Sequence, residues 1–221
     1  MEFLKSGIAI ALLALAALQA QAHSPEEHAR HMAGQAGNPH AQHLAQGAQV
    51  AFADVPLLDQ DGRALRLKDD LVGERIVVMG FVYTSCTTVC PVVSAIMQKL
   101  QKQLGDRAGR EVQLISLSID PLRDTPERLR EFAGRYQAGP GWSWLTGSSE
   151  AVADTLKGLG TWTANYQDHP PLIMVGDGRS QQWTRFYGFT DPAVLLARVD
   201  ELSAAREHDG HDRTALAQET R

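Results

Sequence analysis

The sequence predicts one α/β domain, in which a mixed β-sheet is covered by helices and an added hairpin precedes the central strands. From residue 50 to residue 202, short apolar runs alternate with segments of helical spacing, which is typical of strands joined by helices. Turn signals separate two pairs of runs, as expected for hairpins at the edges of the sheet. About 150 residues is also the usual size of one domain.

The first half of this domain is predicted element by element. Residues 55–59 and 63–67 flank a Gln-Asp-Gly turn and predict the hairpin. Residues 75–83 form a nearly continuous apolar run, which is typical of a strand covered on both faces. A helix follows, because apolar residues recur at helical spacing until Gly105 suits its end. These residues are Val93, Ile96, Met97, Leu100 and Leu104.

The second half continues the alternation. Residues 112–119 predict a strand, and Thr125-Pro126-Glu127 opens a helix with a capping residue, a first-turn proline and a well-placed acid. The remaining elements are a helix after residues 148–149, strands over 172–175 and 182–186 with a turn at 177–178, and a helix from 191–192. The polar tail, residues 203–221, is expected to fray.

Composition excludes several classes of protein. The chain has 221 residues, with 21 Lys and Arg against 26 Asp and Glu, so its net charge of −5 argues against a nucleic-acid binder. A hydrophobic content of 43% is enough for a normal core and excludes wholesale disorder. Two cysteines are too few for a scaffold held together by disulfides.

Residues 1–22 are expected to be a secretory signal peptide. Lys5 precedes an unbroken run of 11 apolar residues, and Ala20-Gln21-Ala22 matches a cleavage pattern. The run is shorter than the ~20 residues of a membrane-spanning helix. The mature chain would then begin at His23 in the oxidising periplasm, with no stable membrane span. An uncleaved membrane tether is the alternative.

Residues 23–49 are expected to be a flexible arm, because they hold almost no long apolar residue. The arm contains five of the eight histidines: His23, His28, His31, His40 and His43. Two pairs repeat the pattern His-Ala-x-His, and histidine-rich tracts are compositional metal binders. An accessory metal site and a polar spacer are both compatible with this composition.

The two cysteines, Cys86 and Cys90, lie between an apolar strand and a helix. Pro91 suits the first position of that helix, so Cys90 is expected near the helix N-terminus, where the dipole lowers the thiol pKa. A thiolate either attacks disulfides or binds metal. The alternatives are a structural disulfide or two buried thiols, although a disulfide across so short a loop removes little chain entropy.

Outside the arm and the tail, which holds His208 and His211, His169 is the remaining histidine. A single histidine in a loop is more often a surface residue, so spacing alone leaves its role open. If it meets the two cysteines, two thiolates and an imidazole suit copper, as Cu(I) or Cu(II), whereas zinc with an open fourth position is the alternative. Asp168 is a possible partner for the imidazole.

Four motifs together give a more specific indication. They are Phe81-x-Tyr83-Thr84-x-Cys86-x-x-x-Cys90-Pro91, Ser118-Ile119-Asp120-Pro121-x-x-Asp124-Thr125-Pro126, Leu145-Thr146-Gly147 and Asp168-His169. In this order they resemble the SCO/SenC family over roughly residues 55–202. The resemblance implies a thioredoxin-like fold and a copper ion bound through Cys86, Cys90 and His169. It also implies a role in assembling the CuA centre of cytochrome c oxidase.

Two positions depart from the family pattern. Thr87 stands where family members commonly carry proline, and Pro171 stands where many carry a small residue. Pro171 resembles the cis-proline that lies against the cysteine pair of thiol–disulfide oxidoreductases. Many relatives also retain a membrane anchor, which this chain is expected to lack.

Two functions therefore compete. We favour a periplasmic copper chaperone that passes copper from a donor to an acceptor protein, such as the CuA subunit of cytochrome c oxidase or another copper enzyme. The alternative is an enzyme, a thiol–disulfide oxidoreductase that reduces the cysteines of the acceptor. For that enzyme, helix position favours Cys90 as the attacking residue, and analogy with thioredoxin favours Cys86. A peroxidase ranks last.

Overall fold

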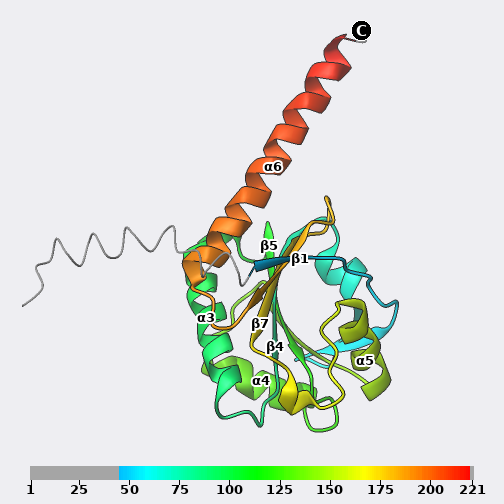
Figure 1. Cartoon of the computed structure of the whole chain (residues 1–221), viewed down its shortest axis with the longest axis vertical. Coiled ribbons are helices and arrows are strands. Elements are labelled where there is room, and N and C mark those ends of the chain that lie inside the picture. The colour runs from blue at the N-terminus through cyan, green and yellow to red at the C-terminus, as the bar shows by residue number, and fades with distance from the viewer. Residues whose placement is uncertain (1–44, 220–221) are drawn as a thin grey trace, which may run out of the picture. The chain divides into compact units, whose positions relative to one another are not determined.

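The computed structural model describes residues 45–219 and the side chains up to residue 208. In this part of the chain, eight strands form one mixed sheet in the order β1-β8-β7-β4-β5-β6-β2-β3 (Figure 1). The strands are β1 (Ala45–Ala48), β2 (Pro56–Asp59), β3 (Ala64–Arg66), β4 (Ile76–Val82), β5 (Val112–Ser118), β6 (Trp142–Thr146), β7 (Leu172–Asp177) and β8 (Trp183–Tyr187).

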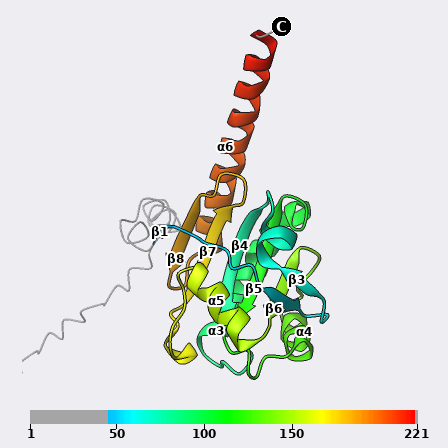
Figure 2. The ribbon, with the colours of Figure 1, turned by 90° about the vertical axis from the view of Figure 1, so that its right-hand side faces the viewer.

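Helices cover both faces of the sheet. The main helices are α3 (Val89–Leu104), α4 (Pro126–Arg135), α5 (Ser149–Gly158) and α6 (Pro192–Glu219), and the short helical turns are η1 (Leu67–Val72), η2 (Gly105–Arg107) and η3 (Tyr166–Asp168). Buried residues of α3, α4 and α6 form one apolar cluster with the sheet, and those of η1 and α5 form the other. Figure 1 and Figure 2 show α3 and α5 on opposite faces. The predicted α/β class is therefore confirmed.

Strand β4 lies at the centre of the sheet and determines where the site forms. All seven of its residues are buried, as its apolar run predicts. It pairs in parallel with β5 and antiparallel with β7, with Gly80 opposite Ile173. Consequently the loops that follow β4 and β5 and the loop that precedes β7 all lie at the same end of the central strands, where β4 finishes.

The predicted elements of the domain are present. The hairpin forms from β2 and β3, and Gly62 adopts a positive φ of 79° in its turn. Thr125 and Ser148 cap α4 and α5, because their side-chain oxygens accept hydrogen bonds from the N–H groups of Arg128 and Ala151. Within the domain, β6 was not predicted; four of its five residues are buried.

The predicted extent of the arm is wrong at its C-terminal end. Residues 45–48 form β1, which pairs antiparallel with β8 in the register Ala45 to Phe186. The sequence Ala-Gln-Gly-Ala has little strand propensity, so backbone pairing with the edge of the sheet determines its conformation. The signal peptide, residues 1–22, and the rest of the arm lie outside the described residues.

The expected fraying from residue 203 is also wrong, since α6 continues to Glu219. Leu202 is the last buried apolar residue, and the next turn is held by polar contacts instead. Arg206 donates hydrogen bonds to both carboxylate oxygens of Asp177, and Ser203 accepts a hydrogen bond from Arg107. No helix in residues 45–219 has the length and apolar character needed to cross a membrane.

Candidate metal centre

The two cysteines lie where β4 passes into α3. The N–H of Cys86 donates to the carbonyl of Tyr83 at 3.1 Å, which closes a tight turn after the strand. The N–H of Cys90, in the first turn of α3, donates to Cys86 Sγ at 3.3 Å. Both thiols are free and buried. The predicted position of the pair, between strand and helix, is therefore confirmed.

The two thiols differ in acidity. Burial raises the pKa of Cys86, but hydrogen bonds from Cys90, Thr88 and Tyr83 outweigh it and leave the pKa at about 7. The pKa of Cys90 is raised, first by burial and then by its hydrogen bond to Cys86. The expectation that the helix N-terminus lowers the pKa of Cys90 is therefore wrong. The helix begins at Val89, which makes Pro91 its third residue, and burial of the Cys90 thiol exceeds any effect of the dipole.

A buried carboxylate fixes the loop that carries Cys86. Asp124 is 1% exposed and accepts hydrogen bonds from the N–H of Thr84 at 3.1 Å, from Thr84 Oγ1 at 2.5 Å and from Ser118 Oγ at 2.6 Å. It thereby ties the end of β4 to the end of β5. Sequence reasoning placed Asp124 in a motif and gave it no role, because its partners Thr84 and Ser118 lie in other segments of the chain.

His169 has the features of a metal ligand that is held in one tautomer. Its Nδ1 lies 2.8 Å from the carbonyl oxygen of Pro170, which can only accept, so Nδ1 carries the proton. Among the residues that the structure describes, its Nε2 is buried and has no hydrogen-bond partner. Burial lowers the pKa of His169, which favours a neutral ring with a free lone pair on Nε2. Asp168, the expected partner of the imidazole, is exposed. The carbonyl of Pro170 accepts the hydrogen bond from Nδ1 instead.

Aromatic contacts bring the His169 loop to the end of β4. The His169 ring lies 5.2 Å from the ring of Phe81, and Tyr166 meets Tyr83 edge-on at 5.0 Å. His169 thus packs on the strand that leads to Cys86. Within residues 45–219, no three His, Cys, Asp or Glu side chains form a group close enough to hold a metal ion. The three-residue ligand set therefore stays a prediction.

Pro171 differs from the oxidoreductase-like proline that was expected. No peptide bond in the described part of the chain is cis, so Pro171 is trans. Its carbonyl accepts a hydrogen bond from the N–H of Gly188 at 2.9 Å, which attaches the His169 loop to the end of β8. Pro171 therefore helps to hold the His169 loop at the end of β8.

Among the other histidines, the structure describes the side chain of His208. His208 is exposed on α6, in its C-terminal half. His23, His28, His31, His40 and His43 lie outside the described residues, as does the side chain of His211. Their expected role as accessory ligands remains a prediction.

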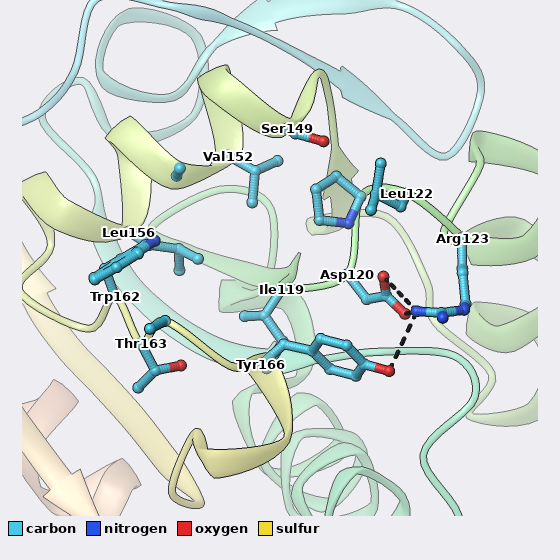
Figure 3. Close-up of a pocket in the computed structure, with 13 residues that line it drawn as sticks. Ile119, Asp120, Leu122, Arg123, Ser149, Val152, Leu156, Trp162, Thr163 and Tyr166 are labelled. Carbon is cyan, nitrogen blue, oxygen red and sulfur yellow. Dashed lines mark hydrogen bonds and ion pairs between the residues drawn. The ribbon is translucent and has the colours of Figure 1, made fainter.

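A cavity of about 200 Å³ lies beside the His169 loop, between α5 and the loop that follows β5 (Figure 3). Leu122 and Trp162 flank it and are strongly exposed, whereas Tyr166 forms part of its wall. Arg123 Nη1 donates to Asp120 Oδ2 at 3.0 Å and lies 3.2 Å from Tyr166 Oη (Figure 3). Sequence reasoning missed this cavity, because its walls come from three separate segments.

The chain has relatives among curated proteins. It is 38% identical over 94 residues to the SCO1 protein homolog of Bacillus subtilis, which covers 42% of this chain and 47% of the relative. It is 30% identical over 110 residues to a putative copper-binding protein of Stutzerimonas stutzeri, covering 50% and 52%. The chain spans about half the length of these two relatives.

Solved structures share its fold. A SCO1/SenC family lipoprotein from Bacillus anthracis matches with a TM-score of 0.61 and 24% identity, covering 72% of this chain and 98% of that one. Copper-bound yeast Sco1 matches with a TM-score of 0.59 and 21% identity, covering 72% and 95%. These likenesses confirm the expected thioredoxin-like fold. The SCO1/SenC family model matches residues 45–203, most of the chain, and this protein therefore belongs to the SCO1/SenC family.

Proposed function

We propose that this protein binds copper as cargo and delivers it during assembly of the CuA centre of cytochrome c oxidase. The observation that carries the proposal is the Nε2 of His169, which is buried and has no hydrogen-bond partner among the described residues. The His169 ring packs against the strand that leads to two free thiols. Relatives support it by name, since one is called a putative copper-binding protein and the structure of Bradyrhizobium japonicum ScoI has copper bound.

The ligands in this proposal are Cys86, Cys90 and His169. Thiolate sulfur selects Cu(I), and imidazole serves both oxidation states of copper. The hydrogen bond from Nδ1 to the Pro170 carbonyl holds the His169 ring with Nε2 as the free donor, which is the usual arrangement of a metal-binding histidine. The donor chemistry thus fits copper, and Nε2 gains the partner that it otherwise lacks.

The experiment compares copper binding by reduced, oxygen-free protein beginning at His23 with binding by its His169→Ala variant. A competing chelator reports Cu(I) affinity, and absorption of the Cu(II) form reports sulfur-to-copper charge transfer. We expect His169→Ala to weaken Cu(I) binding and to change the absorption band. The matched control is His208→Ala, which removes an exposed histidine. Equal behaviour of the two variants would exclude His169 as a ligand.

A thiol–disulfide oxidoreductase is the second candidate, and the hydrogen bonding of the cysteine pair favours it. The Cys90 N–H donates to Cys86 Sγ, which stabilises a thiolate on Cys86. We therefore assign Cys86 as the attacking residue and Cys90 as the resolving one. Reduction of a disulfide in the acceptor protein would persist in His169→Ala, whereas copper delivery would be lost.

We also propose that the protein acts in the periplasm after cleavage of residues 1–22, and that the arm histidines bind additional copper. Because residues 45–48 belong to the sheet, the informative truncation removes residues 23–44 and leaves β1 intact. The truncated protein should bind fewer copper ions per chain and keep its high-affinity site. An unchanged number of bound ions would make the arm a spacer.

A further inference from the structure

Two tyrosines connect the cysteine loop with the histidine loop. Tyr83 lies three residues before Cys86, and Tyr166 lies three residues before His169. Their rings meet edge-on, with centroids 5.0 Å apart and an interplanar angle of 79°. This geometry is a favourable one for an aromatic pair. Each candidate ligand loop therefore carries one half of the same contact.

One residue of the short turn before His169 packs against the core. Within η3, Gln167 and Asp168 are exposed, and Tyr166 is the residue of the turn that packs against the core. A short 3₁₀ turn contributes little stability of its own, so the order of this segment depends on side-chain packing. The Tyr166 ring supplies that packing on the side of the turn that faces β4.

A cation also contacts Tyr166. The guanidinium of Arg123 lies 5.8 Å from the centre of the Tyr166 ring, and its Nη1 is 3.2 Å from the Tyr166 hydroxyl oxygen. The same nitrogen donates to the carboxylate of Asp120, which is 2% exposed at the end of β5 (Figure 3). Tyr166 is thus fixed between the loop after β5 and the end of β4.

We propose that Tyr166, together with Tyr83, is a positioning residue for copper binding: the ring contact holds the His169 loop against the strand that carries Cys86. Neither tyrosine binds the metal; Tyr166 acts through His169, and Tyr83 provides the ring against which Tyr166 packs. The inference rests on the proposed function, because it assumes that His169 is a ligand. Residues that orient a metal-binding histidine typically contribute about 10- to 100-fold to metal affinity.

The central test measures Cu(I) affinity for Tyr166→Leu, alone and combined with His169→Ala. We expect Tyr166→Leu alone to weaken binding about 10-fold, at the lower end of the range for such residues. In the His169→Ala background it should cause no further loss, because the group through which it acts is absent. Trp162→Leu is the matched control, since it removes an exposed ring from the same loop and should leave affinity unchanged.

A conservative variant separates the ring contact from the Tyr166 hydroxyl group. Tyr166→Phe keeps the contact with Tyr83 and removes the hydrogen bond from Arg123. It should bind copper within about threefold of the unmodified protein, well below the effect expected of an orienting residue. A loss in Tyr166→Phe as large as the loss in Tyr166→Leu would overturn the role of the ring contact.

A measurement on metal-free protein provides an independent readout. Hydrogen–deuterium exchange of the backbone at residues 165–169 should become faster in Tyr166→Leu, while exchange in α3 stays the same. Unchanged exchange at residues 165–169 would overturn the inference. Faster exchange throughout the chain would also overturn it, because it would mean a general loss of stability.

The outcomes distinguish this inference from the proposed function. If His169→Ala weakens copper binding and Tyr166→Leu does not, the positioning role is wrong and the proposed function stands. If His169→Ala leaves copper affinity unchanged, the proposed ligand set is wrong. Equal losses from Tyr166→Leu in both backgrounds would show that it acts elsewhere than through His169, and would overturn the inference.

Discussion

The two ends of the central strands differ in how their polar groups are used. At the end where β4 begins, Asp177 accepts hydrogen bonds from Arg206, and Glu111 accepts from Arg107 and Ser203. At the end where β4 finishes, Asp124 and Asp120 are paired too, but His169 Nε2 is buried with no hydrogen-bond partner among the described residues, and two free thiols are buried at the same end. Buried polar groups without partners are costly and uncommon. The first end therefore stabilises the fold, and the second holds donor atoms for a ligand.

The largest expected effect lies at the donor end. Cys86→Ser replaces the sulfur that accepts a hydrogen bond from Cys90 with a harder oxygen, which Cu(I) disfavours. We expect Cu(I) affinity to fall by more than the roughly 100-fold typical for removal of a supporting residue. Chelator competition measures the loss.

Stability of this variant should change little, because the free thiol makes no structural disulfide. Thermal unfolding of the metal-free protein provides the control. If Cys86→Ser unfolded far more easily and kept its copper affinity, the two ends of the sheet would not differ in the way described.

The opposite result is expected for Asp177→Asn at the other end. Asp177 is 1% exposed, so its removal leaves the half-buried Arg206 guanidinium without its carboxylate. Breaking a buried ion pair costs about 3 kcal/mol of unfolding free energy, which urea denaturation measures. Copper affinity should not change. Asp154→Asn is the control, because its exposed ion pair with Lys157 contributes less than about 1 kcal/mol.

The effect of Asp177→Asn should also depend on pH. Burial raises the pKa of Asp177, but hydrogen bonds from Arg206, Arg179 and Ser180 outweigh it and hold the pKa below the ordinary 3.8. A lowered pKa stabilises the folded state above 3.8, and this contribution is lost as the pH falls through the lowered value. The difference in stability between Asp177→Asn and the unmodified protein should therefore shrink below pH 3.8. A difference that stays constant into acid would contradict the assignment.

A third prediction concerns the acidity of Cys86 in metal-free, reduced protein. Its alkylation by iodoacetamide requires the thiolate, so the rate should rise with a midpoint at about pH 7, the pKa of this thiol. In Cys90→Ala the midpoint should move up toward the ordinary value of 9.0, because a hydrogen-bond donor is removed. A midpoint near 9.0 in the unmodified protein would contradict the described environment of Cys86.

The smallest effect is expected for Ser203→Ala. Ser203 donates to Glu111 and accepts from Arg107 on the half-buried contact between α6 and the residues before β5. Loss of such hydrogen bonds should lower the unfolding free energy by about 1 kcal/mol, with no change in copper binding. Urea denaturation of both variants tests whether Ser203→Ala loses less unfolding free energy than Asp177→Asn.

Much of the fold was predictable because its signals are local. The apolar run of β4, the spacing in α3 and the caps of α4 and α5 each lie within one segment. The strand β1 and the continuation of α6 were not predictable, because they depend on pairing with β8 and on the contact of Arg206 with Asp177. Those partners are distant in sequence.

The same distinction applies to the site. The position of the cysteine pair followed from its neighbouring residues, whereas the acidity of each thiol depended on burial and went against the expectation for Cys90. The identity of His169 as the candidate ligand came from resemblance to a family. Its tautomer, its contact with Phe81 and the role of Pro170 required three-dimensional positions that spacing does not contain.

The most direct test of the central claim is X-ray absorption spectroscopy at the copper edge. Reduced protein with one equivalent of Cu(I) would be compared with its His169→Ala variant. We expect a first shell of two sulfur atoms and one nitrogen, with the nitrogen lost in the variant. A shell that contains only sulfur in both proteins, or a nitrogen that persists in His169→Ala, would contradict it.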